Sequence, residues 1–280
     1  RARLFSRWLF WRAAHVIAVS NSIGRLLADH ECVPADRITV LPSAVTAPVS
    51  HGLSSLPAVL RGVPLVGVVA RLHPEKGVAI FLEAVARVAP LVPTCHFPVV
   101  GDGPLRQELE VRAAQLRLQE RVHFLGFRPD ARELVSLLDV LVVPSLSEGA
   151  PLVILEAMMA GVPVVASAIG GIPDLIRHDR EGLQVPPNDP MVLGQAILSL
   201  LQDPVHARRL GEAGRRRAAS QFRYATMLQK IEAIYHVASR IPIAPGASLG
   251  RRRLSLFPRK QGGDGRSRHD AAGSEQANVR

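Results

Sequence analysis

The sequence contains only two cysteines among 280 residues, Cys32 and Cys95, and they form no C-x-x-C pair. This scarcity argues against a disulfide framework, a redox dithiol and a zinc ribbon, and it favours a reducing compartment such as the cytoplasm. No uninterrupted run of about 18 apolar residues is present, so we expect no transmembrane helix. The opening segment 4–19 is apolar, but Arg7 and Arg12 interrupt it and it lacks a signal-peptide cleavage pattern.

Metal-binding patterns are missing as well, because the chain has no Asp-x-Asp motif and no cluster of His and Cys. We therefore expect neither a bound metal nor a cofactor. Lysine is also scarce: of 34 basic residues only three are lysines, namely Lys76, Lys230 and Lys260. A lysine in a loop of such an arginine-rich chain therefore calls for an explanation.

The composition is that of a globular protein, with 48% hydrophobic and 21% charged residues, which excludes collagen-like and fully disordered chains. The formal net charge of +10 is unevenly placed. Residues 240–280 contain nine basic and three acidic residues, a net of 9 − 3 = +6, which leaves +4 for the remainder. We expect this basic tail to be disordered and solvated. Binding of the tail to nucleic acid or to an anionic membrane is the alternative. For the protein as a whole we expect no nucleic-acid partner.

Short apolar runs alternate with helical patterns through most of the chain. Buried strands are expected at 63–70, 97–100, 122–125, 139–145 and 163–167. Helices are expected at 78–88, 105–116, 131–138, 152–160, 188–202, 204–220 and 222–238. The alternation predicts an α/β fold, a parallel sheet with helices on both faces. Ligands of such sheets bind at the carboxyl ends of the strands, so the residues after each strand are the informative ones.

The loop after the first of these strands carries two cations. In the segment 70–77, Arg71 and Lys76 flank the turn that precedes a helix. A helix N-terminus adds free backbone N–H donors, and together with two cations it suits a phosphate or diphosphate. The alternative is a solvated Glu75/Lys76 turn without a ligand.

The second loop, residues 101–104, partly matches a dinucleotide-binding G-x-G-x-x-G pattern. Arg106 stands where the third glycine belongs, and no acidic residue ends a second strand about 20 residues further on. A nicotinamide-dependent dehydrogenase is therefore disfavoured. A tight turn that needs glycine is the simpler interpretation of this loop.

The third loop, at 145–157, follows a buried strand and opens a helix, with Pro151 suited to its first turn. Free backbone amides at its start would point towards the strand ends; they belong to Gly149, Ala150, Leu152 and Val153.

Two glutamates of the third loop, Glu148 and Glu156, suit hydroxyl recognition. An anionic diphosphate would repel a carboxylate, whereas the two hydroxyls of a ribose can both donate to one. If both residues were helical, their separation would be about 12 Å, wider than the roughly 5–9.5 Å of a glycosidase pair. An exposed or salt-bridged helix residue is the alternative for Glu156.

Together the motifs resemble a known family. They read ARLHPEKG at 70–77, VVGDGP at 99–104, VHFLGF at 122–127, DVLVVPSLSEGAPLVILEAMMAGVPVVAS at 139–167, and GGIPDLI at 170–176 with EGLQVPPND at 181–189. In order and spacing they are similar to the donor-binding half of retaining GT-B-fold glycosyltransferases of group 1, also called family 4. The similarity extends over 17–238, where 17–21 and 38–46 resemble the closing strand-helix-strand of the N-terminal domain.

This resemblance implies a role for each charged residue. Arg71 and Lys76 would hold the donor diphosphate and stabilise the leaving group, and Glu156 would bind the ribose. Glu148 would lie near the hydroxyls of the donor sugar, and the catalytic group would be Arg71, Lys76 and Glu148. Backbone atoms would complete the site: Gly149, Ala150, Leu152 and Val153 would face the diphosphate and sugar, and Gly101, Gly126 and Phe127 would line the base.

The resemblance also implies a division into four parts. Residues 1–47 would end an N-terminal acceptor domain, 48–221 would form a Rossmann-like donor-binding domain, 222–239 would be a helix packing back on the N-terminal domain, and 240–280 the basic tail. The sequence begins with Arg1 and lacks most of the family's N-terminal domain, including its Gly-rich loop. We therefore expect the chain by itself to be incomplete and inactive.

Three departures from the family pattern concern small groups of residues. The frequent Gly-Phe-Gly is replaced by residues 149–151, Gly-Ala-Pro, and the Asn-Gly of the linker by residues 43–44, Ser-Ala. The polar residue near the reacting sugar, often His, has no counterpart by position in His15, His73 or His96.

The expected function is transfer of a sugar from a nucleoside diphosphate sugar to an acceptor, with retention of anomeric configuration and without a metal. The acceptor would be lipid-linked or a cell-envelope glycan, and the protein cytoplasmic with peripheral contact at the inner membrane face. One alternative is a non-catalytic nucleotide-sugar-binding module. Another is a sugar-nucleotide epimerase of the same architecture, which the pairing of Glu148 with Glu156 and the Arg71/Lys76 loop disfavour.

Overall fold

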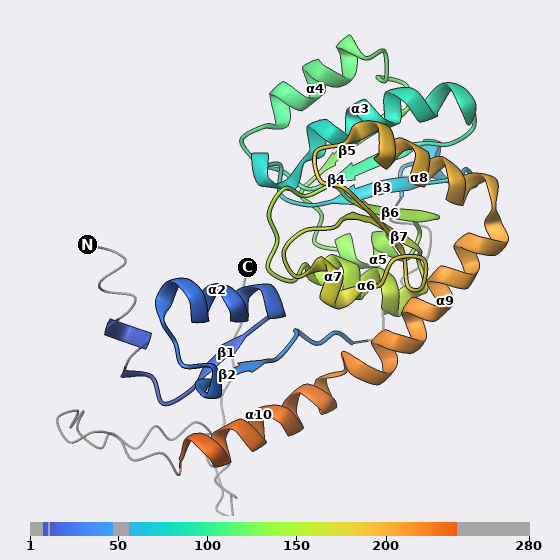
Figure 1. Ribbon diagram of the computed structural model, residues 1–280. Coiled ribbons are helices and arrows are strands. Elements are labelled where there is room, and N and C mark those ends of the chain that lie inside the picture. Colours follow the sequence, from blue (N-terminus) through green and yellow to red (C-terminus); the bar gives the residue numbers. More distant parts are fainter. Residues whose placement is uncertain (1–7, 11, 47–55, 240–280) are drawn as a thin grey trace, which may run out of the picture. The chain divides into compact units, whose positions relative to one another are not determined.

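The computed structural model describes residues 8–10, 12–46 and 56–239 (Figure 1). The expected basic tail at 240–280 and the expected domain boundary between residues 47 and 48 lie outside these ranges.

A parallel sheet of six strands forms the centre of the larger part of the described chain (Figure 1). Its strands are β3 (Val66–Val69), β4 (Phe97–Val100), β5 (Val122–Gly126), β6 (Val140–Val143), β7 (Val164–Ser167) and β8 (Leu183–Val185). Their spatial order is β5-β4-β3-β6-β7-β8, and every neighbouring pair is parallel. The order reverses direction between β3 and β6, which makes this the topological switch point of the sheet.

The strands are apolar throughout because helices cover both faces of the sheet. All residues of β4, β6 and β7 are buried. One face packs against α3 (Val78–Val88), α4 (Arg106–Gln115) and α8 (Pro190–Gln202). The other face packs against α5 (Ala131–Val135), α6 (Leu152–Ala160) and α7 (Ile172–Leu175). The α/β fold class expected from the alternating pattern is confirmed.

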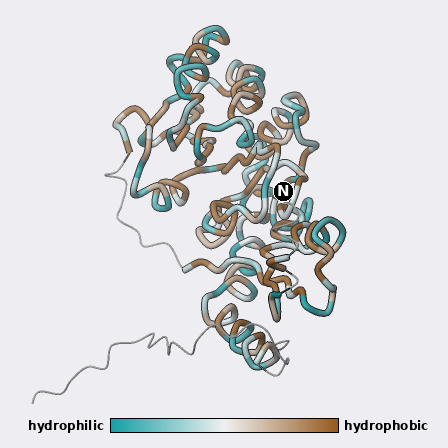
Figure 2. The backbone as a smooth tube through the Cα atoms, turned by 90° about the vertical axis from the view of Figure 1, so that its left-hand side faces the viewer, coloured by the Kyte–Doolittle hydropathy of each residue, from teal (hydrophilic) through white to brown (hydrophobic). Residues whose placement is uncertain are grey.

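The helices begin and end close to the predicted positions. Figure 2 shows hydrophobic and hydrophilic residues alternating along them, as expected for helices with one face in the core. Helix α3 has the predicted bounds, and α9 (Pro204–Gln221) extends one residue further. Helix α8 begins two residues late because the side chain of Asp189 accepts hydrogen bonds from the amides of Met191 and Val192 and so caps it.

Two short elements were not expected. Strand β8 has three residues and helix α7 four, and such short segments carry no periodic signal. Helix α5 ends at Val135, three residues before the predicted end at 138.

A separate two-stranded parallel sheet lies near the start of the described chain. Strands β1 (Val16–Ala18) and β2 (Ile38–Val40) pair in register, and α2 (Asn21–Glu31) connects them. This is the strand-helix-strand unit expected from the resemblance.

The last described helix is α10 (Tyr224–Ala238). The amide of Val45 donates to the carbonyl of Phe222, the C-cap residue that follows α9. Phe222 is buried, whereas Leu228 and Tyr235 of α10 are 53% and 71% exposed. The expected packing of this helix on an N-terminal domain stays a prediction.

Candidate functional site

The loops that follow β3 and β6 meet at the switch point of the sheet. A cavity of about 230 Å³ lies between them, lined by Val68–Arg71, Lys76, Val142–Ser145, Glu148 and Pro151–Val153. Of the predicted site residues, Arg71, Lys76, Glu148, Leu152 and Val153 are thus brought together. Gly149 and Ala150 lie in the same loop without lining this cavity.

Lys76 is joined to the loop after β6 by a charged hydrogen bond. Its Nζ donates to Oε1 of Glu148 over 2.7 Å, across 72 residues of sequence. The side chains of Lys76 and Glu148 are 22% and 9% exposed, so the pair is largely shielded from water. The hydroxyl of Ser145 donates to the same oxygen over 2.9 Å. Lys76 is therefore not a solvated side chain, whereas the side chain of Glu75 in the same turn is 38% exposed.

Arg71 lies at the rim of the cavity. Its guanidinium donates to Oε1 of Glu75 over 2.9 Å, and its side chain is 62% exposed. This hydrogen bond is the main reason that the pKa of Glu75 lies below its ordinary value. Both predicted phosphate-binding cations thus have a carboxylate partner in this structure, and an anionic ligand would have to compete with those carboxylates.

Gly77 allows the two loops to come close. It adopts a left-handed backbone with φ of 64°, and a Cβ at this position would lie 2.0 Å from the carbonyl oxygen of Pro144. The amide of Leu146 donates to the carbonyl of Glu75 over 2.8 Å. These contacts hold the loop of Lys76 against the loop of Glu148, so a side chain at position 77 would force them apart.

The N-terminus of α6 points its free amides into the same region. No side chain caps this helix, and its N-cap residue is Pro151, which has no N–H. Within the described residues, the amides of Gly149, Ala150, Leu152 and Val153 donate to no protein acceptor. A helix start of this kind attracts anions through its amides and its dipole.

Glu156 lies on α6 one turn beyond Leu152, and therefore on the same side of the helix. It does not line the 230 Å³ cavity. The side chain is half-buried and accepts no hydrogen bond from the described residues. Burial raises the pKa of Glu156 above its ordinary value, and the positive charge of Arg132 offsets this only in part. A partly desolvated carboxylate without a protein partner is available to accept hydrogen bonds from a ligand.

The predicted base-binding residues lie at the neighbouring strand ends, after β4 and β5. The amide of Gly101 donates to the carbonyl of Gly126 over 2.8 Å, which joins the two turns. Phe127 is 78% exposed. Arg106 bridges this region by donating to Asp102, Glu110 and the carbonyl of Phe124. These residues form a separate group that does not line the Lys76 cavity.

Two contributions to the site were missed by sequence reasoning. One is Ser145, which lies three residues before Glu148 and donates to its carboxylate. This short spacing is the signal from which the contact could have been predicted. The other is the turn at Gly170 and Gly171, in which a Cβ would lie 1.8 Å from the carbonyl oxygens of Glu148 and Gly149, respectively. The GGIPDLI motif therefore supports the backbone that carries Glu148.

Asp174 of the same motif contacts α2. The backbone amide and the side-chain amide of Asn21 donate to the two carboxylate oxygens of Asp174, over 2.7 and 2.9 Å. The carboxylate of Asp174 thus lies at the start of α2, where the helix dipole favours a negative charge.

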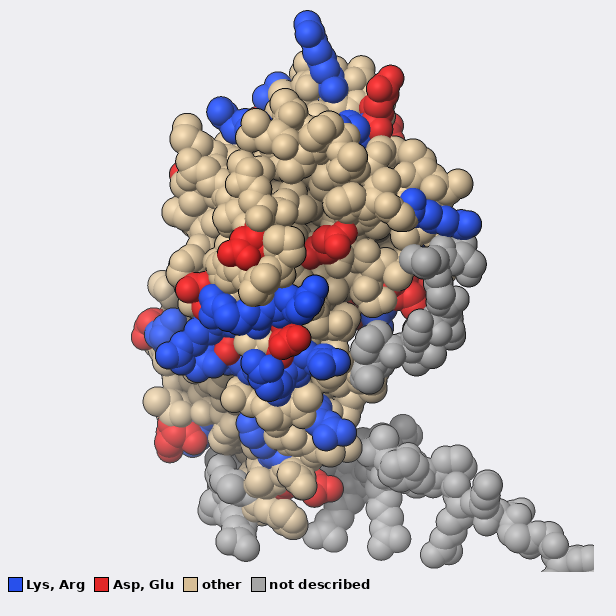
Figure 3. Space-filling view, turned by 90° about the vertical axis from the view of Figure 1, so that its right-hand side faces the viewer, with Lys and Arg blue, Asp and Glu red and all other residues tan. Residues whose placement is uncertain are grey.

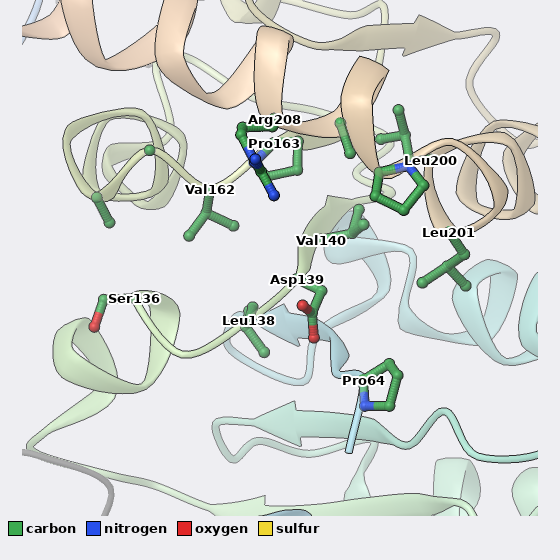
Figure 4. A pocket seen from close by; sticks show the side chains of 14 residues that line it. Pro64, Ser136, Leu138, Asp139, Val140, Val162, Pro163, Leu200, Leu201 and Arg208 are labelled. Atoms are coloured by element: carbon green, nitrogen blue, oxygen red, sulfur yellow. The ribbon is translucent and has the colours of Figure 1, made fainter. Parts of the chain in front are cut away.

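A larger cavity of about 460 Å³ lies at the opposite edge of the sheet, where β6 and β7 begin (Figure 4). Leu138, Val162, Leu200 and Arg208 are among the side chains around it. None of the predicted site residues lines it. The chemistry-bearing loops converge at the carboxyl edge of the sheet, so the candidate site is the smaller cavity.

The described residues contain neither a metal-ligand cluster nor a membrane-spanning helix. No three or more His, Cys, Asp or Glu side chains gather there as metal ligands would. None of the helices in these ranges combines the length and apolar character that crossing a membrane requires.

Comparison with protein families gives one match over the larger sheet. The model described as "Glycosyl transferases group 1" matches residues 59–217, more than half of the chain. The 2-deoxystreptamine glucosyltransferase of Streptomyces kanamyceticus is 31% identical over 226 residues, 77% of this chain and 58% of that protein. The UDP-Gal:alpha-D-GlcNAc-diphosphoundecaprenol alpha-1,3-galactosyltransferase of Escherichia coli is 32% identical over 170 residues, 60% of this chain and 44% of that protein.

Among solved structures, HepE from Anabaena in complex with UDP superposes with a TM-score of 0.72 and 26% identity, covering 80% of this chain and 64% of HepE. The same protein with UDP-glucose gives a TM-score of 0.71. The chain thus spans 44% to 64% of the length of these three relatives. The architecture is that of GT-B glycosyltransferases.

Proposed function

Because the chain belongs to the glycosyl transferases group 1 family, we propose that it supplies the donor site of an enzyme that moves a sugar from a nucleoside diphosphate sugar to an acceptor. The observation that carries this proposal is the Lys76–Glu148 pair beside the uncapped start of α6, at the switch point of the sheet. A cation, free amides and a carboxylate side by side match a ligand that is a diphosphate at one end and a polyol at the other.

The proposed mechanism follows from where charge develops. When the bond between the anomeric carbon and the diphosphate breaks, negative charge grows on the departing phosphate. Lys76, Arg71 and the amides at the start of α6 are positioned to stabilise that charge, and they do so more strongly in the transition state than in the bound substrate. To reach the diphosphate, Lys76 exchanges its partner Glu148 for the ligand.

The two glutamates act on hydroxyls in this proposal. Glu148 accepts from the donor sugar, Glu156 accepts from the ribose, and the base lies against Gly101, Gly126 and Phe127. We propose further that transfer retains the anomeric configuration, as in family 4, and needs no metal and no cofactor beyond the nucleotide sugar. The hexosyl donor is proposed by analogy with HepE, which was solved with UDP-glucose.

Nucleotide binding tests the proposal directly. UDP, GDP and ADP are added in turn to the chain, and the unfolding midpoint Tm is followed by differential scanning fluorimetry. At a concentration 100 times its Kd, the correct nucleotide stabilises the fold by about 2.7 kcal/mol, which corresponds to a rise of about 5–10 °C for a domain of this size. The matching nucleoside, without phosphates, serves as the control and leaves Tm nearly unchanged.

Two results bear on the alternatives. If none of the three diphosphates raises Tm or binds in calorimetry, the donor-site proposal is wrong. If a nucleotide sugar binds and is converted to its epimer without any acceptor, the protein is an epimerase of the same architecture instead.

The acceptor is proposed to be lipid-linked. The name of the Escherichia coli relative specifies an acceptor on diphosphoundecaprenol, a membrane lipid. An enzyme that uses such an acceptor has to work at a bilayer, so we propose peripheral contact with an anionic membrane surface.

Helix α9 offers a surface suited to that contact. It contains five arginines and one glutamate. Figure 3 shows a band of Lys and Arg side chains on this side of the molecule, interrupted by few acidic ones. Arg208 and Arg215 lie two turns apart on one face of α9, are exposed, and form no ion pair within the described residues. Unpaired exposed arginines are available to anionic lipid head groups, each contributing about 1 kcal/mol near the surface.

Vesicle binding tests this contact. We expect the chain to sediment with vesicles of phosphatidylcholine and phosphatidylglycerol but not with phosphatidylcholine alone. The double variant Arg208→Gln/Arg215→Gln loses about 2 kcal/mol, a roughly thirtyfold weaker partition. The matched control Arg25→Gln/Arg87→Gln removes two exposed arginines elsewhere and should partition like the unchanged protein. Equal binding by the α9 variant would show that another part of the chain makes the contact.

A further inference from the structure

The carboxylate of Glu148 is held from one side only. Within the described residues its two donors, Nζ of Lys76 at 2.7 Å and Oγ of Ser145 at 2.9 Å, both donate to the same oxygen, Oε1. Within the described residues Oε2 receives no hydrogen bond, although Glu148 lines the cavity. One oxygen is thus anchored to the protein, and the other is left to accept from a ligand.

Ser145 is placed to be a rigid anchor. It follows β6 directly after Pro144 and is 2% exposed, so its side chain is fixed by the core. The backbone of Glu148 is fixed as well, because its carbonyl accepts from the amide of Gly171. The hydrogen bond from Oγ of Ser145 to Oε1 of Glu148 therefore joins two residues whose backbones are fixed. The orientation of the Glu148 carboxylate depends on this hydrogen bond.

The two donors to Oε1 differ in what a diphosphate does to them. Lys76 is a cation and is attracted by an anionic ligand, whereas the neutral Ser145 hydroxyl is not attracted in this way and keeps its hydrogen bond to Glu148. When Lys76 turns to the diphosphate, Ser145 remains the protein donor to Oε1. Without it, a carboxylate 9% exposed would lose its last protein partner and become free to rotate.

We propose that Ser145 is a positioning residue that keeps Oε2 of Glu148 presented to a hydroxyl of the donor sugar while Lys76 binds the diphosphate. This inference rests on the proposed donor site, and it adds a residue whose effect is confined to the sugar end of the ligand. UDP, which has no sugar beyond its ribose, should be indifferent to it.

Calorimetry on the full chain separates the two ends of the ligand. The Kd values of UDP and of UDP-glucose are measured for the unchanged protein, Ser145→Ala and Ser145→Thr; if GDP proves to be the nucleotide bound, GDP and GDP-mannose replace them. In Ser145→Ala we expect the Kd of the nucleotide to stay within about twofold, and the ratio of sugar nucleotide to nucleotide Kd to rise about five- to tenfold. Ser145→Thr retains the hydroxyl and keeps the original ratio.

A control and a double variant make the test specific. Ser147→Ala removes an exposed hydroxyl from the same loop and should leave both Kd values unchanged. In a Glu148→Gln background, Ser145→Ala should add little further change, because Ser145 acts through that carboxylate. A merely structural role would weaken both ligands together.

The outcomes distinguish this inference from the proposed function. If no nucleoside diphosphate binds the unchanged protein, the proposed donor site itself fails. If the unchanged protein binds nucleotides but the ratio in Ser145→Ala stays as it was, or both ligands weaken equally, the role assigned to Ser145 is refuted and the donor site stands.

Discussion

Replacing Lys76 with alanine is expected to weaken UDP binding by at least about tenfold, or 1.4 kcal/mol. The change removes the largely shielded cation of the cavity, and with it a charge-assisted hydrogen bond to the diphosphate. It also leaves Glu148 without its ionic partner, so a carboxylate then faces the incoming anion. Calorimetry with UDP and with uridine checks the result, because uridine lacks the phosphates and should lose little.

Two further variants sharpen this expectation. Lys230→Ala removes an exposed lysine from α10 and should bind UDP as the unchanged protein does. The double variant Lys76→Ala/Glu148→Gln should bind UDP more tightly than Lys76→Ala alone, since the repelling charge is gone. If Lys76→Ala binds UDP normally, Lys76 does not hold a diphosphate and the assignment of the site is wrong. In the intact enzyme we expect turnover to fall by at least about tenfold as well.

The variant Glu156→Gln is expected to be more stable than the unchanged protein at neutral pH while binding UDP at least about tenfold more weakly. Burial raises the pKa of Glu156 above its ordinary value of 4.5, so the folded state holds its proton more tightly than the unfolded state. The ionised carboxylate therefore lowers stability as the pH rises through the raised pKa, and this cost is fully present above it. Glutamine removes the cost, and with it the charge that would hold the ribose hydroxyls.

Two measurements check these opposite effects. Thermal unfolding followed from pH 4 to pH 8 should show a higher Tm for Glu156→Gln at neutral pH, with the difference vanishing below about 4.5, where the carboxyl is protonated in both states. Calorimetry with UDP and 2′-deoxy-UDP should show that the variant loses discrimination between the two. Glu232→Gln, an exposed change on α10, is the control. Lower stability of Glu156→Gln at neutral pH, together with undiminished UDP binding, would contradict the role given to Glu156.

The charged residues of the candidate site were identified from short-range signals, whereas Gly101, Gly126 and Phe127 were assigned through the family resemblance. Arg71 and Lys76 stood out as cations between an apolar run and a helical pattern, and Glu148 stood out because it precedes a proline that opens a helix. Signals of this kind depend on neighbours within a few residues, which is why the strand ends and helix starts were predicted closely. Segments without enough residues to show a period, such as β8 and α7, escaped notice.

The contacts within the site were not predictable in the same way. The bond from Lys76 to Glu148 crosses 72 residues, and it exists because β3 lies beside β6 in the sheet. The preference of a strand for one neighbour is decided by burial over both faces of the sheet, to which every helix contributes. The residues of the two loops therefore do not indicate which strands will be neighbours. The same holds for Gly170 and Gly171, whose close approach to the backbone of Glu148 and Gly149 depends on how α7 packs.

Apolar periodicity was thus enough to predict the α/β fold, and loop chemistry was enough to propose a phosphate site at its strand ends, because both depend on residues that are adjacent in the sequence. Which cation meets which carboxylate, and that Ser145 shares an oxygen with Lys76, emerged only once the strands were ordered. Side-chain partners far apart in sequence are selected by the packing of the whole sheet, because a close-packed core fixes the position of each loop relative to the others.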